Sequence, residues 1–335
     1  MHPEADHATQ RQQVIYALVA ALIVVAVVLR FWRLGAWNLE ATEIFTLRDS
    51  LRPRLTNPRP LGYLLNYYLV LPFMPLDEFG LRVLPALCGV LAVVAIYLVS
   101  RRLIGTRGAL LCSLALTVSE LHIYYSQFAR YWSLVFLLCT IYPFALYLGI
   151  REHNRAALAL GVIAGILAAL AHPVAVLLLG GPAIWLTARF VRPNTLRRLW
   201  SRPGVRWATG AVVLLLVLIA VRFVPLLHHW ITMHDRNPGS GQFLYQPTRN
   251  GPRQLVYLIA FVESLTVPVV LGAVAGLYVL WRNGDRTLAA YLTSLALFPL
   301  VFIVLLSMRT PVSQFYLVPT LPVYYIGVGV FLASL

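Results

Sequence analysis

Long apolar runs alternate with short polar segments along most of the chain. Most runs approach the roughly 20 residues that an α-helix needs to cross a bilayer. They cover approximately Val14–Phe31, Phe79–Ser100, Ala109–Val118, Tyr131–Ile150, Ala156–Ala171, Val174–Ala188, Trp207–Leu227, Leu255–Trp281, Thr287–Ser307 and Gln314–Leu335. The pattern predicts an all-α polytopic membrane protein of about ten transmembrane helices, a single transmembrane domain over residues 1–335.

The first run, Val14–Phe31, predicts an uncleaved anchor rather than a signal peptide. It is longer than a signal-peptide core, and Trp32 and Arg33 follow it in place of a small-residue cleavage site.

The stretch Leu61–Pro75 is short for a span and contains Gly62, Asn66, Pro72 and Pro75. If it lies at the interface, the arginine-rich loops near residues 101–107, 151–155, 189–206 and 282–286 share one side. The positive-inside rule makes that side the cytoplasm, together with the N-terminus. Residues 35–79 then form a large first external loop with interfacial helices, and residues 228–253 form a second external loop.

The alternative topology has an external N-terminus and a Leu61–Pro75 segment that spans the bilayer. It suits Arg48, Arg52, Arg54 and Arg59 better, because positive charges favour the cytoplasmic side. Both topologies place every later loop identically, so charge alone does not separate them.

Composition excludes a soluble protein. Of the 335 residues, 60% are hydrophobic and 12% are charged, against about 25% charged in a soluble domain. The net charge of +15 comes entirely from arginine, since the chain has no lysine. The arginines are scattered between apolar runs, which argues against nucleic acid as a partner. The three cysteines lie within apolar runs without the spacing of metal ligands.

Ionisable residues in or beside the predicted spans fall at the external level in the preferred topology. They are Arg82, Arg130, His172, Arg222, Glu263 and Arg309. Buried charges are costly unless they are paired or face a cavity. One interpretation is a cationic external cavity for a lipid phosphate or diphosphate, because the arginine fork matches two phosphate oxygens. The alternative is that each arginine reaches to the interface and pairs locally.

Several motifs resemble those of the GT-C class, the membrane glycosyltransferases that use polyprenyl-phosphate sugars and include protein O-mannosyltransferases and aminoarabinose transferases. The matching stretches are Trp37–Thr46, Asn57–Leu65, Phe79–Gly89, Tyr125–Tyr131 and Tyr316–Pro322. They resemble, in order, the family's Asp-Glu motif, its His-Pro-Pro-Leu-Tyr stretch, its Gly…Arg…Gly helix opening, its Tyr-Ser-Gln-Glu-Ala-Arg-x-Tyr motif and a late tyrosine segment. Their order and spacing carry the resemblance.

The chain departs from these motifs at polar positions. Thr42 stands for the Asp of Asp-Glu, Arg59 for a His, Phe128 for a Glu and Phe315 for an Arg. A second register puts Glu40 on the family's Glu. The chain is also short for the family and stops in an apolar run, which is compatible with a fragment.

The resemblance implies transfer of a sugar from a polyprenyl-phosphate donor at the external face of the inner membrane. A carboxylate takes the acceptor's proton while lipid phosphate leaves. Glu43 is the candidate base and Glu40 the reserve. The candidate substrate ligands are Arg82, Arg130, Tyr131, Arg59, Tyr63, His172, Arg222, Glu263 and Arg309. A metal requirement, the sugar and the acceptor stay open.

Several of these residues also have a structural interpretation. Glu43 can pair with Arg48 or Arg52, His172 can cap a helix, and Glu263 can pair with Arg222. Two other functions therefore remain: a non-catalytic polyprenyl-phosphate binder or translocator, and an unrelated transporter, which should show internal repeats.

Overall fold

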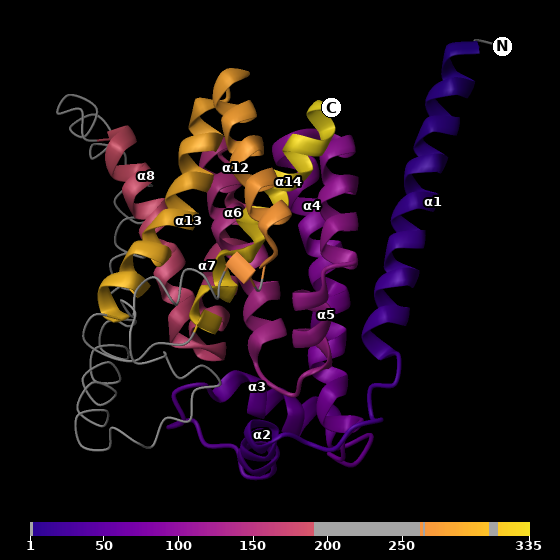
Figure 1. Cartoon of the computed structure of the whole chain (residues 1–335), viewed down its shortest axis with the longest axis vertical. Coiled ribbons are helices and arrows are strands. Elements are labelled where there is room, and N and C mark those ends of the chain that lie inside the picture. Colours follow the sequence, from indigo (N-terminus) through magenta and orange to yellow (C-terminus); the bar gives the residue numbers. More distant parts are fainter. Residues whose placement is uncertain (1–2, 191–261, 264, 308–313) are drawn as a thin grey trace.

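The computed structural model describes residues 3–190, 262–263, 265–307 and 314–335. Over these residues the chain is helical and contains no strand. The longer helices run roughly side by side, and short helices cross one end of the bundle (Figure 1). The all-α expectation is confirmed for this part of the chain.

Five helical segments in the described part are long and apolar enough to cross a membrane. They lie in α1 (Pro3–Phe31), α4 (Gly80–Thr117), α6 (Trp132–Arg151), α13 (Arg286–Ser307) and the segment Phe315–Ser334, which includes α14 (Leu321–Ser334). Shorter apolar helices include α7 (Arg155–Ala171) and α12 (Val267–Arg282). The count of about ten spans stays a prediction, since Trp207–Leu227 lies outside the described residues.

Helix α4 contains two predicted runs, Phe79–Ser100 and Ala109–Val118. Gly105 breaks the helix with φ +78° and ψ 173°, a conformation that glycine adopts at little cost. The two parts fold back on each other there, because one side chain of α1 contacts both of them. Arg30 Nη2 donates to the Leu116 carbonyl oxygen at 3.2 Å. Arg30 Cδ lies 3.1 Å from the position that a Cβ on Gly89 would take. The two predicted runs therefore form a helical hairpin within one element.

The run Val174–Ala188 is divided in the structure. A 3₁₀ segment, η2 (Pro173–Leu179), precedes the helix α8 (Gly180–Phe190). Pro173 explains the break, because proline cannot continue the hydrogen-bond ladder of α7. A second 3₁₀ segment, η3 (Gln314–Thr320), leads into α14.

The stretch Leu61–Pro75 does not form a long helix. It contains the end of α3 (Pro60–Leu65), a π-helical turn η1 (Asn66–Val70) and a turn. With α2 (Ala41–Leu51), these elements lie at one end of the bundle (Figure 1). This arrangement fits the preferred topology, in which the stretch does not span the bilayer.

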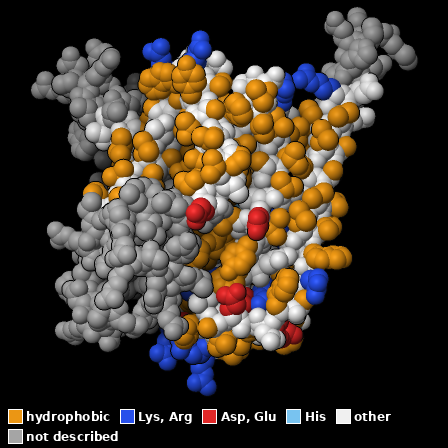
Figure 2. Space-filling model, viewed as in Figure 1, with side chains coloured by type: hydrophobic (Ala, Val, Ile, Leu, Met, Phe, Trp, Pro, Cys, Tyr) orange, Lys and Arg blue, Asp and Glu red, His pale blue; other side chains and the backbone are white. Residues whose placement is uncertain are grey.

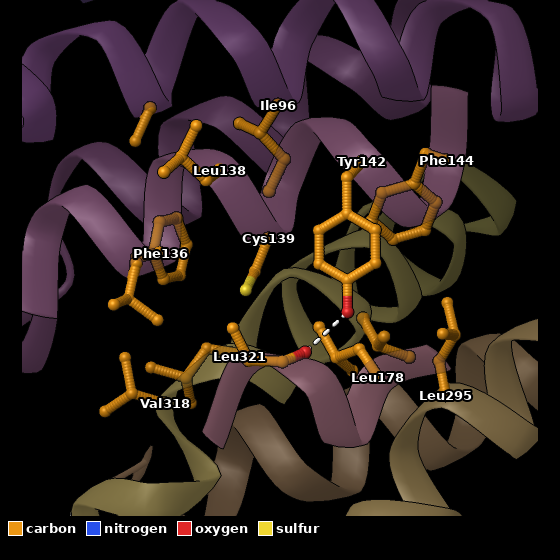
Figure 3. Close-up of a cluster of buried hydrophobic side chains, with 14 of the residues drawn as sticks. Ile96, Phe136, Leu138, Cys139, Tyr142, Phe144, Leu178, Leu295, Val318 and Leu321 are labelled. Atoms are coloured by element: carbon orange, nitrogen blue, oxygen red, sulfur yellow. Dashed lines mark hydrogen bonds between the residues drawn. The ribbon is translucent and has the colours of Figure 1, made fainter. Parts of the chain in front are cut away.

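The core lies between α4, α6, α7, α13 and α14. Tyr142 points from α6 toward η2 and donates a hydrogen bond of 2.6 Å to the Ala175 carbonyl oxygen (Figure 3). Leu178 of η2 lies in the same cluster, and Leu295 of α13 and Leu321 of α14 bring in two further elements (Figure 3). On the face shown in Figure 2, apolar side chains cover most of the middle and arginines gather toward both ends, as expected for a bilayer-spanning protein.

Candidate functional site

The short helices place several of the predicted site residues together. α2 packs against α3, and α5 (Glu120–Gln127) leads into the turn that carries Ala129 and Arg130. The Glu40 backbone N–H donates to Glu43 Oε2 at 2.9 Å, and this capping hydrogen bond stabilises the first turn of α2. The loop helices thus bring the Glu43 region beside a turn more than 80 residues later in the chain.

Glu43 and Arg82 form a buried ion pair that links α2 to the first turn of α4. Arg82 Nη2 lies 2.7 Å from Glu43 Oε2, and the side chains are 3% and 0% exposed. Arg82 Nε donates to Glu43 Oε1 at 2.9 Å, so the contact is bidentate. The expected local partners Arg48 and Arg52 are not the residues that hold Glu43.

The hydrogen-bonding capacity of both side chains is fully used. Arg82 has five N–H donors; two go to Glu43 and three to the carbonyl oxygens of Leu34, Trp37 and Asn38. The Glu43 oxygens also accept the N–H groups of Glu40 and Ala129. Action as a base by Glu43, or phosphate binding by Arg82, would require some of these bonds to break.

The environment of Glu43 favours the ionised carboxylate. Burial raises the pKa of Glu43. The hydrogen bonds from Arg82, Ala129 and Glu40 and the charge of Arg82 together lower it by more, so the pKa lies below its usual value. Glu43 is therefore charged at neutral pH.

Arg59 and Arg130 converge on Tyr131. The guanidinium carbons of Arg59 and Arg130 lie 4.9 and 4.8 Å from the Tyr131 ring centroid. Each also donates to the Tyr131 hydroxyl oxygen, Arg130 at 3.2 Å. Arg130 further donates to the Thr42 carbonyl oxygen at 2.9 Å and to Thr46 Oγ1 at 3.2 Å. Two cations therefore meet at one phenol.

Neither cation has a carboxylate partner within 4.0 Å among the described residues, where the ion pairs are Arg48–Asp49, Glu43–Arg82, Arg102–Glu152 and Arg151–Asp285. Two arginines close together repel each other unless an anion or dipoles compensate them. The arrangement can therefore bind an anion, and a phosphate suits the arginine fork.

Aromatic residues form the bundle side of this cationic site. The His172 ring lies 4.9 Å from the Tyr131 ring and 5.7 Å from the Tyr316 ring. His172 Nδ1 accepts the Val174 N–H at 3.1 Å, so it also caps η2 as the structural interpretation expects. Burial, then the charges of Arg59 and Arg130, lowers the pKa of His172 well below its usual value. The imidazole is therefore neutral.

Tyr63 on α3 lies near the same cations. Burial raises its pKa, although the charges of Arg130 and Arg59 act in the opposite direction. The phenol therefore keeps its proton and can donate a hydrogen bond.

Glu40 starts the helix whose Thr42 and Thr46 contact Arg130, whereas the other remaining candidates lie farther along the chain or outside the described residues. Glu40 is exposed at the start of α2, and Glu263 is exposed shortly before α12. Arg222, Arg309 and the predicted second loop over 228–253 lie outside the described residues, so the expected Arg222–Glu263 pair is not tested. No group of three or more His, Cys, Asp or Glu side chains in the described part of the chain is arranged to hold a metal ion.

Asn66 was not among the predicted site residues, although it lines a small cavity beside Arg130. The available signal is the amide of Asn66 within the otherwise apolar stretch after Leu61, because a polar side chain in such a stretch needs a partner when it is buried.

The fold and the site define a multi-pass helical membrane protein with a cationic site at one end of its bundle. Residues 60–223, just under half of the chain, match the dolichyl-phosphate-mannose-protein mannosyltransferase family. The expected resemblance to GT-C glycosyltransferases that use polyprenyl-phosphate sugars is thereby confirmed. No curated protein sequence matches the chain.

Two solved structures share this fold. Apo ArnT from Cupriavidus metallidurans is 18% identical with a TM-score of 0.61. ArnT from the same organism bound to undecaprenyl phosphate is 17% identical with a TM-score of 0.63. Each match covers 98% of this chain but only 60% and 61% of the ArnT chain. The chain thus spans about three fifths of the length of ArnT.

Proposed function

We propose that this protein is a glycosyltransferase of the external face of the inner membrane, which moves a sugar from a polyprenyl-phosphate donor to an acceptor hydroxyl. The observation that carries the proposal is the convergence of Arg59 and Arg130 on Tyr131 without a carboxylate partner in the described part of the chain. The family match and the undecaprenyl phosphate bound to the ArnT relative support a lipid phosphate as the anion.

Arg59 and Arg130 hold the donor phosphate in this proposal. The acceptor oxygen forms a bond to the anomeric carbon, and the bond from that carbon to the phosphate oxygen breaks. The phosphate leaves with the electron pair, and the two guanidinium groups stabilise its growing charge. The neutral His172 and the protonated Tyr63 add no negative charge near it.

Glu40 is the proposed base, which takes the proton of the acceptor hydroxyl, and the Glu43–Arg82 pair positions the site. Glu40 is exposed at the start of the helix that contacts Arg130 through Thr42 and Thr46. Glu43 Oε1 instead accepts a hydrogen bond of 2.6 Å from the N–H of Ala129, the residue immediately before Arg130. The ion pair with Arg82 thereby fixes the turn from which Arg130 projects.

One substitution tests this assignment in the purified full chain. Glu40→Gln should reduce sugar transfer from undecaprenyl-phosphate sugars at least 100-fold, because general-base catalysis contributes about 10²–10⁴-fold. Binding of undecaprenyl phosphate and thermal stability should stay unchanged. Retained transfer by Glu40→Gln would contradict its role as the base.

A non-catalytic polyprenyl-phosphate binder is the second candidate function. Thr42 stands where the resembling motif has an aspartate, and both Glu43 oxygens are already occupied. This candidate predicts that the wild type binds undecaprenyl phosphate and transfers no sugar from any donor. The third candidate, an unrelated transporter, is disfavoured by the shared fold.

A further inference from the structure

Asn66 is a buried amide with an incomplete set of hydrogen bonds. Asn66 is the first residue of the π-helical turn η1 and is 3% exposed. Asn66 Nδ2 donates to Ser50 Oγ at 3.0 Å, whereas Oδ1 has no partner. Leaving a buried carbonyl oxygen unpaired costs about 1–3 kcal/mol. Such a group in a native fold therefore calls for a partner that the chain itself does not supply.

A small cavity borders Asn66. Its lining also includes Thr46, Tyr63, Arg130 and Tyr131, and the remaining walls are largely apolar. The space that a water-sized sphere can occupy is about 20 Å³, which is room for about one hydroxyl-sized group. The cavity thus lies directly beside Arg130, one of the two cations proposed to hold the phosphate.

The orientation of the amide does not alter this conclusion. Exchanging the amide oxygen and nitrogen would pair Ser50 Oγ with the oxygen and leave the nitrogen unpartnered. A hydroxyl can both donate and accept, so it satisfies either orientation. A carboxylate can only accept, so it would satisfy one orientation. An apolar group would satisfy neither orientation.

We propose that this cavity receives one hydroxyl of the sugar that the lipid phosphate carries, and that Asn66 is a specificity residue for that sugar. The inference rests on the proposed function, since the sugar is covalently attached to the phosphate at Arg130. The phosphate places the ring beside the cavity, and the Asn66 amide then distinguishes a sugar that directs a hydroxyl into it from one that does not. Tyr63, which keeps its proton, also lines the cavity and is a hydrogen-bond donor available to the same sugar.

The test compares the affinity of the full chain for undecaprenyl phosphate with its affinity for undecaprenyl-phosphate mannose, glucose, galactose and arabinose. For each sugar, the affinity for the sugar-carrying lipid divided by the affinity for undecaprenyl phosphate isolates the contribution of the sugar. Asn66→Leu, with similar volume and no polar atom, should lower the ratio for the preferred sugar about fivefold, in the range of one lost hydrogen bond. It should leave the affinity for undecaprenyl phosphate unchanged. Asn66→Ala, which leaves the cavity open, should lower the ratio similarly.

Ser50→Ala is the matched control, because it removes the other partner of Asn66 without altering the cavity. It should leave the ratio unchanged. An unchanged ratio in both Asn66 variants, as expected if a structural water fills the cavity, overturns the proposal. A wild type that binds undecaprenyl phosphate but gains no affinity from any of the four sugars also overturns it. A wild type that does not bind undecaprenyl phosphate at all overturns the proposed function instead.

Discussion

Glu43 and Arg82 are joined by a bidentate ion pair although 39 residues separate them in the sequence. Both side chains are almost fully buried, and the five Arg82 donors are all engaged. The pair connects the first loop, the start of α4 and the turn at Ala129. It therefore fixes the position of Arg130, which follows Ala129 directly.

Breaking this pair should destabilise the fold. Glu43→Gln leaves a buried guanidinium without its counter-charge, which costs about 3–5 kcal/mol. The expected result is a clear fall in the melting temperature of the detergent-solubilised protein. Arg102→Gln breaks an ion pair that is 57% and 41% exposed and should cost under about 1 kcal/mol. Equal melting temperatures for the two variants would contradict a structural role of the Glu43–Arg82 pair.

The same pair predicts an acid-dependent stability. The folded-state pKa of Glu43 is lowered from its usual 4.5. Its stabilising contribution is therefore fully present above pH 4.5 and is lost as the pH falls through the folded-state value. Melting temperatures measured from pH 7 to pH 3 should show a steeper acid loss for the wild type than for Glu43→Gln. Parallel curves would show that Glu43 does not titrate as described.

The crossing of α12 and α14 should not tolerate a methyl group. A Cβ on Gly276 would lie 1.9 Å from the Gly327 carbonyl oxygen, which is backbone and cannot turn aside. Gly276→Ala should therefore force the helices apart and cost about 1–3 kcal/mol. Gly165→Ala is the control, since its Cβ would lie 3.6 Å from the nearest side-chain atom. Equal stability of the two variants, measured by thermal unfolding, would refute this close packing.

The predicted topology can be tested with membrane-impermeant thiol reagents. The three native cysteines are buried, which keeps background labelling low. Phe73→Cys, at a position 81% exposed in the first loop, should be labelled from the external side of intact cells. Arg107→Cys, exposed near the turn of the α4 hairpin, should be labelled only after the membrane is opened. Labelling of both positions from the same side would contradict the assignment.

Much of the fold follows from local sequence patterns. The hairpin of α4 was predictable because two apolar runs flank Arg101, Arg102 and Arg107, and proline and glycine marked Leu61–Pro75 as a poor span. These signals act over a few residues. The overall span count was not predictable to the same degree, because kinked and 3₁₀ segments such as η2 divide apolar runs without changing their composition.

The sequence predicts which residues lie together at one end of the bundle better than it predicts their contacts, and their role in binding substrate stays a prediction. Arg59, Arg130, Tyr131, Tyr63 and His172 all came from motifs or charge placement, and they do lie together. Which arginine Glu43 would bind depends on tertiary contacts between residues far apart in sequence. Local spacing favours Arg48 or Arg52, whereas the fold brings Arg82 to the carboxylate.

In the proposed function, Arg59 and Arg130 together bind a lipid phosphate. The decisive experiment measures the equilibrium binding of undecaprenyl phosphate to the purified wild type, Arg59→Gln, Arg130→Gln and the control Arg102→Gln. The loss of a hydrogen-bonded charge costs about 1.5–3 kcal/mol, so each site variant should bind at least about tenfold more weakly, whereas the control should match the wild type. Wild-type affinity in both site variants would contradict the claim.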